Sequence, residues 1–155
     1  MRVTDILRVK GGTLFTASPD EGLSRAVQEM ADKDIGSLVV MEHGDLVGML
    51  TFREVIQSLV ANGGSLGTTL VRKAMDDHPL TCTPETEIDE LRRLMLGRHA
   101  RYTPVMSQNM LMGVISFYDV AKAVVDAQDF ENRMLKAYIR DWPVEEASDE
   151  KAAPN

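Results

Sequence analysis

The chain carries the stretch Gly48-Met49-Leu50-Thr51-Phe52-Arg53-Glu54, which returns 65 positions later as Gly113-Val114-Ile115-Ser116-Phe117-Tyr118-Asp119. In both copies a short apolar run ends at a hydroxyl residue, and a carboxylate follows three residues later. This spacing is typical of a capping box, in which the hydroxyl and the carboxylate each accept a hydrogen bond from a backbone amide at a helix start. The stretch therefore predicts, twice, a strand that leads directly into a helix. The second box fits the pattern less well, because aspartate is the shorter partner.

The similarity extends on both sides of this motif. Residues 16–60 align without a gap on residues 81–125, so that Pro19 corresponds to Pro84 and Met30 to Met95. A period this long, present only twice, indicates a pseudo-symmetric pair rather than a solenoid. Because each copy alone could bury only a marginal core, we expect the two copies to pack face to face.

Each copy predicts the order β-α-β-β-α, which places the protein in the α/β (α+β) class. Apolar residues three and four apart predict the helices, and short β-rich runs separated by a turn predict a hairpin. The first helix of each copy is expected to begin after Ser18 or Thr83 as its N-cap. The expected elements are strands at 14–16 and 80–83, helices at 21–33 and 86–98, hairpins at 37–50 and 102–115, and helices at 52–61 and 117–127.

The domain boundaries follow from this repeat. The first unit is expected to take residues 1–62 and the second residues 63–127, with 62–69 as a linker and 70–127 as the core of the second unit. A further helical pattern covers 128–142. The tail, 143–155, is acidic and rich in small residues, which predicts disorder.

Composition excludes several functional classes. The 155 residues carry a net charge of −7, which disfavours general binding to nucleic acid. One cysteine and three scattered histidines give no disulfide, no metal site and no nucleophile–base pair, so we expect no enzyme. No apolar run is long enough to span a membrane, and the first residues lack a signal peptide's apolar region. A reducing, cytoplasmic setting is therefore expected.

Together, three features resemble a tandem pair of cystathionine β-synthase (CBS) domains, in particular the small bacterial proteins that consist of such a pair and a closing helix. These features are the duplicated Gly-x-x-Thr/Ser-x-x-Glu/Asp motif, the run Ile35-Gly36-Ser37-Leu38-Val39-Val40 and the run from Arg98 to Val105. Residues 131–139 resemble that closing helix. The resemblance covers about residues 1–140.

The resemblance implies a non-enzymatic regulatory module. It would need no catalytic cofactor and would bind an adenosyl ligand such as AMP, ADP, ATP, NAD(H) or S-adenosylmethionine in one of two clefts, as an energy or redox sensor. Ligand binding would change the packing of the two repeats. A partner protein, which the sequence does not identify, would respond to that change, and a homodimer is the expected assembly.

The resemblance also assigns residues to the two clefts. In the first cleft Asp119 would hold the ribose, and Arg101 would face the phosphates; the other expected residues are Ser116, Tyr118, Gly36, Ser37 and Gly12. In the second cleft Glu54 would hold the ribose, with Thr51, Arg53 and Tyr102 around it. Because the family usually has aspartate at the motif carboxylate, and Glu54 is one methylene longer, we expect the Asp119 cleft to be the primary site.

Three questions stay open. The clefts could be degenerate, which would leave a structural or partner-docking module. The cluster Arg98, His99 and Arg101 could be a solvated helix end rather than a phosphate site. The apolar stripe Phe130, Met134, Tyr138 and Trp142 could close over its own domain or pair with a second copy. Cys82 and most of the ten methionines are expected to fill the core.

Overall fold

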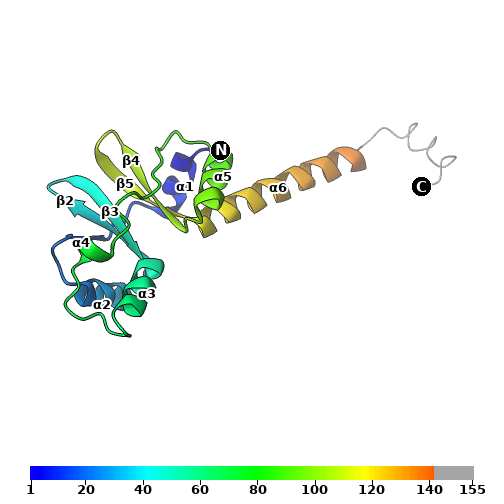
Figure 1. The fold of residues 1–155 in the computed structure, drawn as a ribbon. Coiled ribbons are helices and arrows are strands. Elements are labelled where there is room, and N and C mark those ends of the chain that lie inside the picture. The colour runs from blue at the N-terminus through cyan, green and yellow to red at the C-terminus, as the bar shows by residue number, and fades with distance from the viewer. Residues whose placement is uncertain (142–155) are drawn as a thin grey trace.

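The computed structural model describes residues 1–141, and its two halves repeat one arrangement of strands and helices (Figure 1). The predicted fold class, two repeats of strands and helices with a C-terminal helix, is confirmed. The elements in chain order are α1 (Val3–Lys10), β1 (Thr16–Ala17), α2 (Leu23–Lys33), β2 (Ser37–Glu42), β3 (Asp45–Thr51), α3 (Phe52–Ala61), α4 (Val71–Ala74), α5 (Ile88–Arg98), β4 (Tyr102–Ser107), β5 (Met110–Ser116) and α6 (Phe117–Arg140).

Each repeat is built on an antiparallel hairpin, β2–β3 in the first and β4–β5 in the second. In the first repeat β1 pairs with β2 in parallel, and in the second a parallel bridge from Cys82 to Val105 takes its place. The ladder of each hairpin is irregular at one point, between Val40 and Met41 and again between Val105 and Met106. These two points correspond under the 65-residue shift, so the duplication extends to the irregularity of the strands.

The two repeats exchange their leading helices. Val3 of α1 is buried in the core of the second repeat, and Val71 of α4 is buried in the core of the first. Backbone bonds fix both exchanges: Val3 N donates to Thr86 O at 2.9 Å, and Val71 N donates to Glu21 O at 3.0 Å. Neither helix was predicted from the sequence. Because each core takes a helix from the segment that precedes the other repeat, the two cores depend on each other.

The motif glycines lie where these exchanged segments cross the hairpins. A Cβ built on Gly48 would come within 2.6 Å of Met75 Sδ and 2.8 Å of the backbone oxygen of Asp76. One built on Gly113 would come within 2.8 Å of Leu7 Cδ2 in α1. All three distances are shorter than real Cβ contacts. Packing against the backbone of the exchanged segment therefore requires glycine at position 48, whereas at Gly113 only the end of the Leu7 side chain would have to move.

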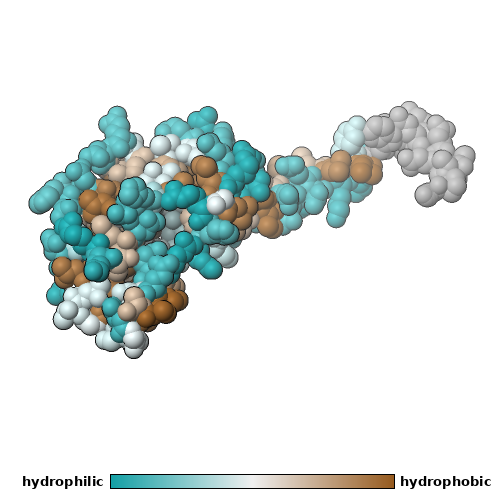
Figure 2. Space-filling view, in the orientation of Figure 1, coloured by the Kyte–Doolittle hydropathy of each residue, from teal (hydrophilic) through white to brown (hydrophobic). Residues whose placement is uncertain are grey.

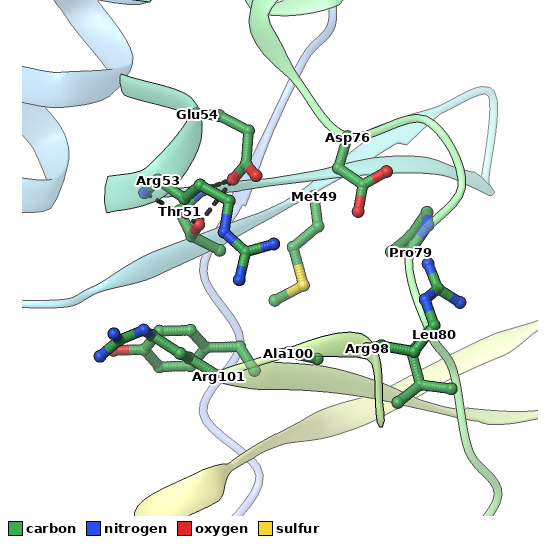
Figure 3. Close-up of a pocket in the computed structure, with 11 residues that line it drawn as sticks. Met49, Thr51, Arg53, Glu54, Asp76, Pro79, Leu80, Arg98, Ala100 and Arg101 are labelled. Carbon is green, nitrogen blue, oxygen red and sulfur yellow. Dashed lines mark hydrogen bonds between the residues drawn. The ribbon is translucent and has the colours of Figure 1, made fainter. Parts of the chain in front are cut away.

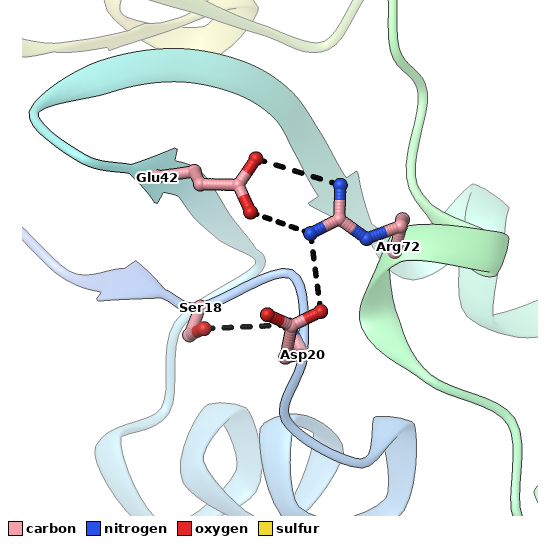
Figure 4. A network of polar contacts seen from close by, with 4 residues as sticks. All are labelled: Ser18, Asp20, Glu42 and Arg72. Atoms are coloured by element: carbon pink, nitrogen blue, oxygen red, sulfur yellow. Dashed lines mark hydrogen bonds and ion pairs between the residues drawn. The ribbon is translucent and has the colours of Figure 1, made fainter.

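A network of charges holds α4 on the first repeat (Figure 4). Arg72 Nη2 lies 2.5 Å from Glu42 Oε2 and 3.0 Å from Asp20 Oδ1. These hydrogen bonds, first to Glu42 and then to Asp20, raise the pKa of the Arg72 guanidinium above its ordinary value. The turn that carries Asp20 is closed by Ser18, whose Oγ accepts a bond from Asp20 N at 3.3 Å.

Several sequence expectations need correction. The first helix of each repeat begins at Leu23 and Ile88, about two residues later than expected, with Gly22 and Glu87 as N-caps in place of Ser18 and Thr83. Ser18 closes the preceding turn instead. The helices expected at 117–127 and 128–142 form one continuous helix, α6, because no helix-breaking residue separates them. The tail and Trp142 lie outside the described residues.

The continuous α6 argues against one of the two interpretations of its apolar stripe. The second half of the helix projects away from both repeats, so it does not close over its own domain (Figure 1). Of the methionines expected in the core, Met30, Met49 and Met95 are buried. Met41 and Met106 are half-buried. Met112 is exposed, because its position on β5 faces solvent.

Candidate functional site

Glu54 lies at the start of α3, where the predicted capping box is complete. Its Oε1 accepts hydrogen bonds from Thr51 N at 2.7 Å and from Thr51 Oγ1 at 2.6 Å. The residue is only 8% exposed. Within residues 1–141 no hydrogen bond reaches Glu54 Oε2, so one oxygen of a nearly buried carboxylate is left for another donor.

Asp119 forms the same box at the start of α6, contrary to the expectation that the shorter side chain would fit less well. Its Oδ2 accepts Ser116 N at 2.9 Å, and Asp119 N donates to Ser116 Oγ at 3.0 Å. The same Oδ2 also lies 2.6 Å from the ammonium of Lys10. Burial works to raise the pKa of Asp119, but the bonds from Lys10 and Ser116 outweigh it and lower that pKa.

A small cavity of about 70 Å³ lies beside Glu54, between the two repeats (Figure 3). Thr51, Arg53 and Glu54 enter it from the junction of β3 and α3, and Ala100 and Arg101 enter from the segment before β4. The full lining is Met49, Thr51, Arg53, Glu54, Asp76, Pro79, Leu80, Arg98, Ala100, Arg101 and Tyr102. The cavity is therefore shared by both copies of the repeat.

Three guanidinium groups gather at this cavity, and none of them forms an ion pair with a carboxylate of the described residues. Arg53 donates to the backbone oxygen of His99, and Arg98 Nη2 donates to His78 O at 2.7 Å. Arg101 makes no side-chain hydrogen bond with any residue in the range 1–141. In a chain with a net charge of −7, such a cluster is a local site for an anion.

Two larger grooves adjoin this cavity, each of about 620 Å³. Both share Arg53, Arg101 and Tyr102 with it. One continues along α3 past Ile56, and the other reaches Ser116 and Tyr118 at the start of α6. The cavity has room for one polar group, and the grooves extend it to the size of a small organic ligand.

The residues expected around Asp119 are placed differently. Asp119 lines a groove of about 220 Å³ between α1 and α6, together with Lys10 and Lys122. Arg101, expected to face this carboxylate's ligand, does not line the groove at Asp119; it lines the cavity at Glu54 and the groove that reaches Ser116 and Tyr118. The reason is that the loop before β4 lies opposite the start of α3, so that each repeat completes the other's cleft.

Gly36, Ser37 and Gly12 have distinct surroundings. A Cβ on Gly36 would overlap the hydroxyl of Tyr102, so the two repeats touch there through a ring packed on a glycine. Ser37 pairs with Thr51 across the β2–β3 ladder. Gly12 is exposed in the loop after α1, and nothing lies within 4 Å of a Cβ built on it. Tyr118 is likewise exposed.

The resemblance places the backbone of the loop from Lys10 to Thr13 at the Asp119 cleft, but neither the ion pair of the Lys10 side chain with Asp119 nor Asp76 at Glu54 was predicted. The 65-residue shift relates Lys10 to Met75 and Gly11 to Asp76. Extending the internal alignment beyond residues 16–60 would have brought both to attention. The signal is weak, because these positions are not alike in residue type.

Residues 1–141 give no support for a metal site, a membrane-spanning helix or a reactive thiol. They contain no group of three metal-ligating side chains, and none of their helices is long and apolar enough to cross a membrane. Cys82 is buried in the core of the second repeat, as expected. That burial raises the pKa of its thiol to about 12, so it is a poor nucleophile.

Comparisons with known proteins agree on one family. The model of the CBS domain matches residues 3–61 and again 71–126. The mitochondrial CBS domain-containing protein CBSX3 of Arabidopsis thaliana is 30% identical over 147 residues, which cover 89% of this chain and 71% of that protein. A CBS-domain protein of Agrobacterium tumefaciens has a crystal structure with a TM-score of 0.75 and 30% identity, covering 79% of this chain and 98% of its own.

A more distant likeness shows the fold alone. The CBS domain pair of protein MJ0100, crystallised with 5′-methylthioadenosine and S-adenosyl-L-methionine, has a TM-score of 0.71 at 20% identity. It covers 82% of this chain and 98% of its own. The duplicated motif, the exchanged helices and the two family matches lead to one conclusion: this chain belongs to the CBS domain family, as a tandem pair of CBS domains.

Proposed function

We propose that this protein is a non-enzymatic regulatory module that binds an adenosyl ligand carrying phosphate, such as AMP, ADP, ATP or NAD(H), in the cleft at Glu54. The observation that carries the proposal is the gathering of Arg53, Arg98 and Arg101 beside a nearly buried carboxylate, in an acidic chain. The ligands in the structure of the MJ0100 pair share an adenosyl group and support that part of the ligand. Neither carries a phosphate, so the phosphate is inferred from the guanidinium groups alone.

The two kinds of charge suit the two ends of such a ligand. Glu54 Oε2 would accept from a ribose hydroxyl, as acidic residues do in dinucleotide folds. Arg53 and Arg101 would bind the phosphates, because a guanidinium matches phosphate geometry. Tyr102 offers an apolar ring at the point where the cavity meets both grooves. Ser116 and Tyr118, expected at the Asp119 cleft, lie along one of these grooves.

This assignment reverses the order of preference drawn from the sequence. Each carboxylate keeps one oxygen without a hydrogen bond from a described residue, but the other oxygen of Asp119 is paired with the ammonium of Lys10, whereas that of Glu54 bonds only to Thr51. Of the described cavities, the one at Glu54 collects the guanidinium groups. We therefore assign the first site to Glu54 and retain the cleft at Asp119 as a second and weaker site, at which contacts from Gly36, Ser37 and Gly12 stay a prediction.

A ligand at Glu54 would contact both repeats, which is how binding would become a signal. The cavity is lined by the start of α3 from one repeat and by the segment before β4 from the other. A ligand that prefers one arrangement of the two would shift the population toward it. The partner protein would be recognised through surfaces that move with that shift.

The test is isothermal titration with AMP, ATP and NADH. We expect binding by the wild type and an affinity for the preferred ligand at least tenfold lower in Arg101→Gln. Arg93→Gln is the matched control, because Arg93 lies on α5 and pairs with Asp89 rather than with the cavity. Absence of binding to the wild type, or equal affinity in both variants, would refute the assignment.

A second candidate function, a docking module, is favoured by apolar faces that the fold leaves exposed (Figure 2). On α3, Phe52, Ile56 and Val60 are more than half exposed and lie four residues apart. On the projecting half of α6, Phe130, Met134 and Leu135 are also more than half exposed. A helix that projects into water is marginal without packing, so we propose that a second copy of the chain covers these faces in a homodimer.

Light scattering after gel filtration tests this assembly. We expect twice the mass of one chain for the wild type and a monomer for Met134→Lys. Lys136→Glu, a charge change on the same projecting half, should leave the dimer intact. A monomeric wild type would refute the homodimer and leave the ligand proposal unaffected.

A further inference from the structure

Lys10 makes a direct ion pair with the motif carboxylate of the second repeat. Its Nζ lies 2.6 Å from Asp119 Oδ2, and the side chain of Asp119 is only 18% exposed. The same oxygen also accepts the amide of Ser116. A ribose diol that approached both oxygens of this carboxylate would meet the lysine ammonium on one of them.

The fold sets the place from which Lys10 reaches this carboxylate. Lys10 is the last residue of α1, which ends where Gly11 adopts a φ of 92°. The other end of α1 is fixed by the buried Val3, whose amide donates to Thr86 O. The backbone of Lys10 is thus held by a packed helix, while its side chain is 40% exposed and can rotate.

The cleft at Glu54 has no ion pair of this kind among the described residues. The 65-residue shift places Met75 where Lys10 stands, and among the described residues Glu54 forms no ion pair. The two motif carboxylates therefore differ in what a ligand must displace. Both carboxylates keep one oxygen free of described hydrogen bonds, but a diol that takes both oxygens meets only the Thr51 amide and hydroxyl at Glu54 and an ammonium at Asp119.

We propose that Lys10 is a specificity-determining residue of the Asp119 cleft, where it selects phosphate-bearing adenosyl ligands over neutral nucleosides. A neutral nucleoside that took the carboxylate would leave the ammonium without its counter-charge in a half-buried groove, which is unfavourable. A nucleotide brings a phosphate with which the released ammonium can pair. The inference rests on the proposed function, since it requires that this cleft bind adenosyl ligands at all.

The experiment follows the backbone amides of Asp119 and Ala123, which line the Asp119 groove and neither the Glu54 cavity nor its two grooves, by NMR while AMP or adenosine is added. These signals report the affinity at this cleft regardless of what the other cleft binds. We expect the wild type to prefer AMP over adenosine by about tenfold. In Lys10→Met the preference should fall toward one, with adenosine bound more tightly and AMP more weakly.

The matched control is Lys33→Met. Lys33 lies on α2, outside the Asp119 groove, and its ammonium pairs with Glu29 at 2.9 Å, so its removal should leave the preference unchanged. An unchanged preference in Lys10→Met, or an equal change for both ligands, would overturn the role of Lys10. If only the amides of Thr51 and Glu54 respond, the inference fails while the proposed function stands. If neither cleft responds, both fail.

Discussion

The clefts at Glu54 and Asp119 begin from the same local structure and end with different chemistry. Both carboxylates complete a capping box at a helix start, and both lie where a strand meets a helix. They differ in the segment exchanged from the other half of the chain, which brings Lys10 to one and Asp76 to the other. The duplicated motif thus builds the frame of a cleft, and the exchanged segment sets which charged groups face that cleft.

The comparison of the two clefts also separates two roles of the motif carboxylate, which are helix capping and ligand binding. In its capping role the side chain satisfies backbone donors that would otherwise lack a partner. A carboxylate can accept about four hydrogen bonds, so capping and ligand binding are compatible. At Glu54 the second role stays open, and at Asp119 Lys10 competes for it. Substitutions at corresponding positions of the two repeats therefore measure how the surroundings of the two motifs differ.

The largest effect is expected at the motif glycines. Gly48→Ala would press a methyl group against the backbone oxygen of Asp76, which cannot move without breaking its pairing with Met49. Gly113→Ala would press only on the end of the Leu7 side chain. We expect Gly48→Ala to lower the free energy of unfolding by about 3 kcal/mol and Gly113→Ala by about 1 kcal/mol.

Urea denaturation of both variants measures this difference. Gly97→Ala serves as the control, because nothing lies within 4 Å of a Cβ built at Gly97. An equal loss of stability in Gly48→Ala and Gly113→Ala would mean that the two exchanged segments are equivalent supports, and the contrast between backbone and side-chain contact would be wrong.

A smaller effect, of opposite sign, is expected at Thr103. Its side chain is fully buried, and its hydroxyl has no hydrogen-bond partner among residues 1–141. The corresponding residue of the first repeat is Leu38, which is also fully buried. Because an unpaired buried hydroxyl is costly, Thr103→Val should raise the free energy of unfolding by about 1 kcal/mol.

Thermal unfolding is the measurement for this substitution. Thr86→Val provides the contrast, since Thr86 Oγ1 accepts a bond from Thr83 N at 3.0 Å and its loss should destabilise the protein. Should Thr103→Val destabilise the protein as well, the Thr103 hydroxyl would have a hydrogen-bond partner in solution.

The smallest effect is expected in the acid dependence of stability. The pKa of Asp119 is lowered in the folded protein, so its ionised form contributes stability at pH values above the ordinary value of 3.8. That contribution is lost as the pH falls below 3.8 and through the lowered pKa. Asp119→Asn should therefore be less stable than the wild type at pH 7, by less than about 1 kcal/mol, and equally stable at the acid end.

Denaturation at a series of pH values checks this prediction. Lys10→Met should show part of the same change, because the bond from Lys10 is the largest cause that lowers the pKa of Asp119. A constant difference between Asp119→Asn and the wild type across the acid range would mean that no ionisation of Asp119 is coupled to folding.

The sequence predicted the features that depend on local pattern. The repeat, both hairpins, the starts of α3 and α6 and the burial of Cys82 follow from residue spacing and were confirmed. It did not predict α1 or α4. Helices of eight and four residues are too short to form by propensity alone, and these two are held by packing on the opposite repeat.

The candidate site shows the same limit. Glu54, Arg53 and Thr51 belong to one motif, and the structure brings them together at one cavity as expected. The places of Arg101 and Lys10 depend on which segment of one repeat faces which carboxylate of the other. Such long-range placement leaves no periodic pattern in the sequence, so the preference for the Asp119 cleft rested on residue type alone.

The most direct test of the cleft assignment is a crystal structure of the wild-type protein with AMP. We predict that the phosphate lies against Arg53 and Arg101 and that the ribose lies on Glu54, in the cavity shared by the two repeats. AMP bound only at Asp119, with the guanidinium groups of Arg53 and Arg101 making no contact with it, would contradict this prediction.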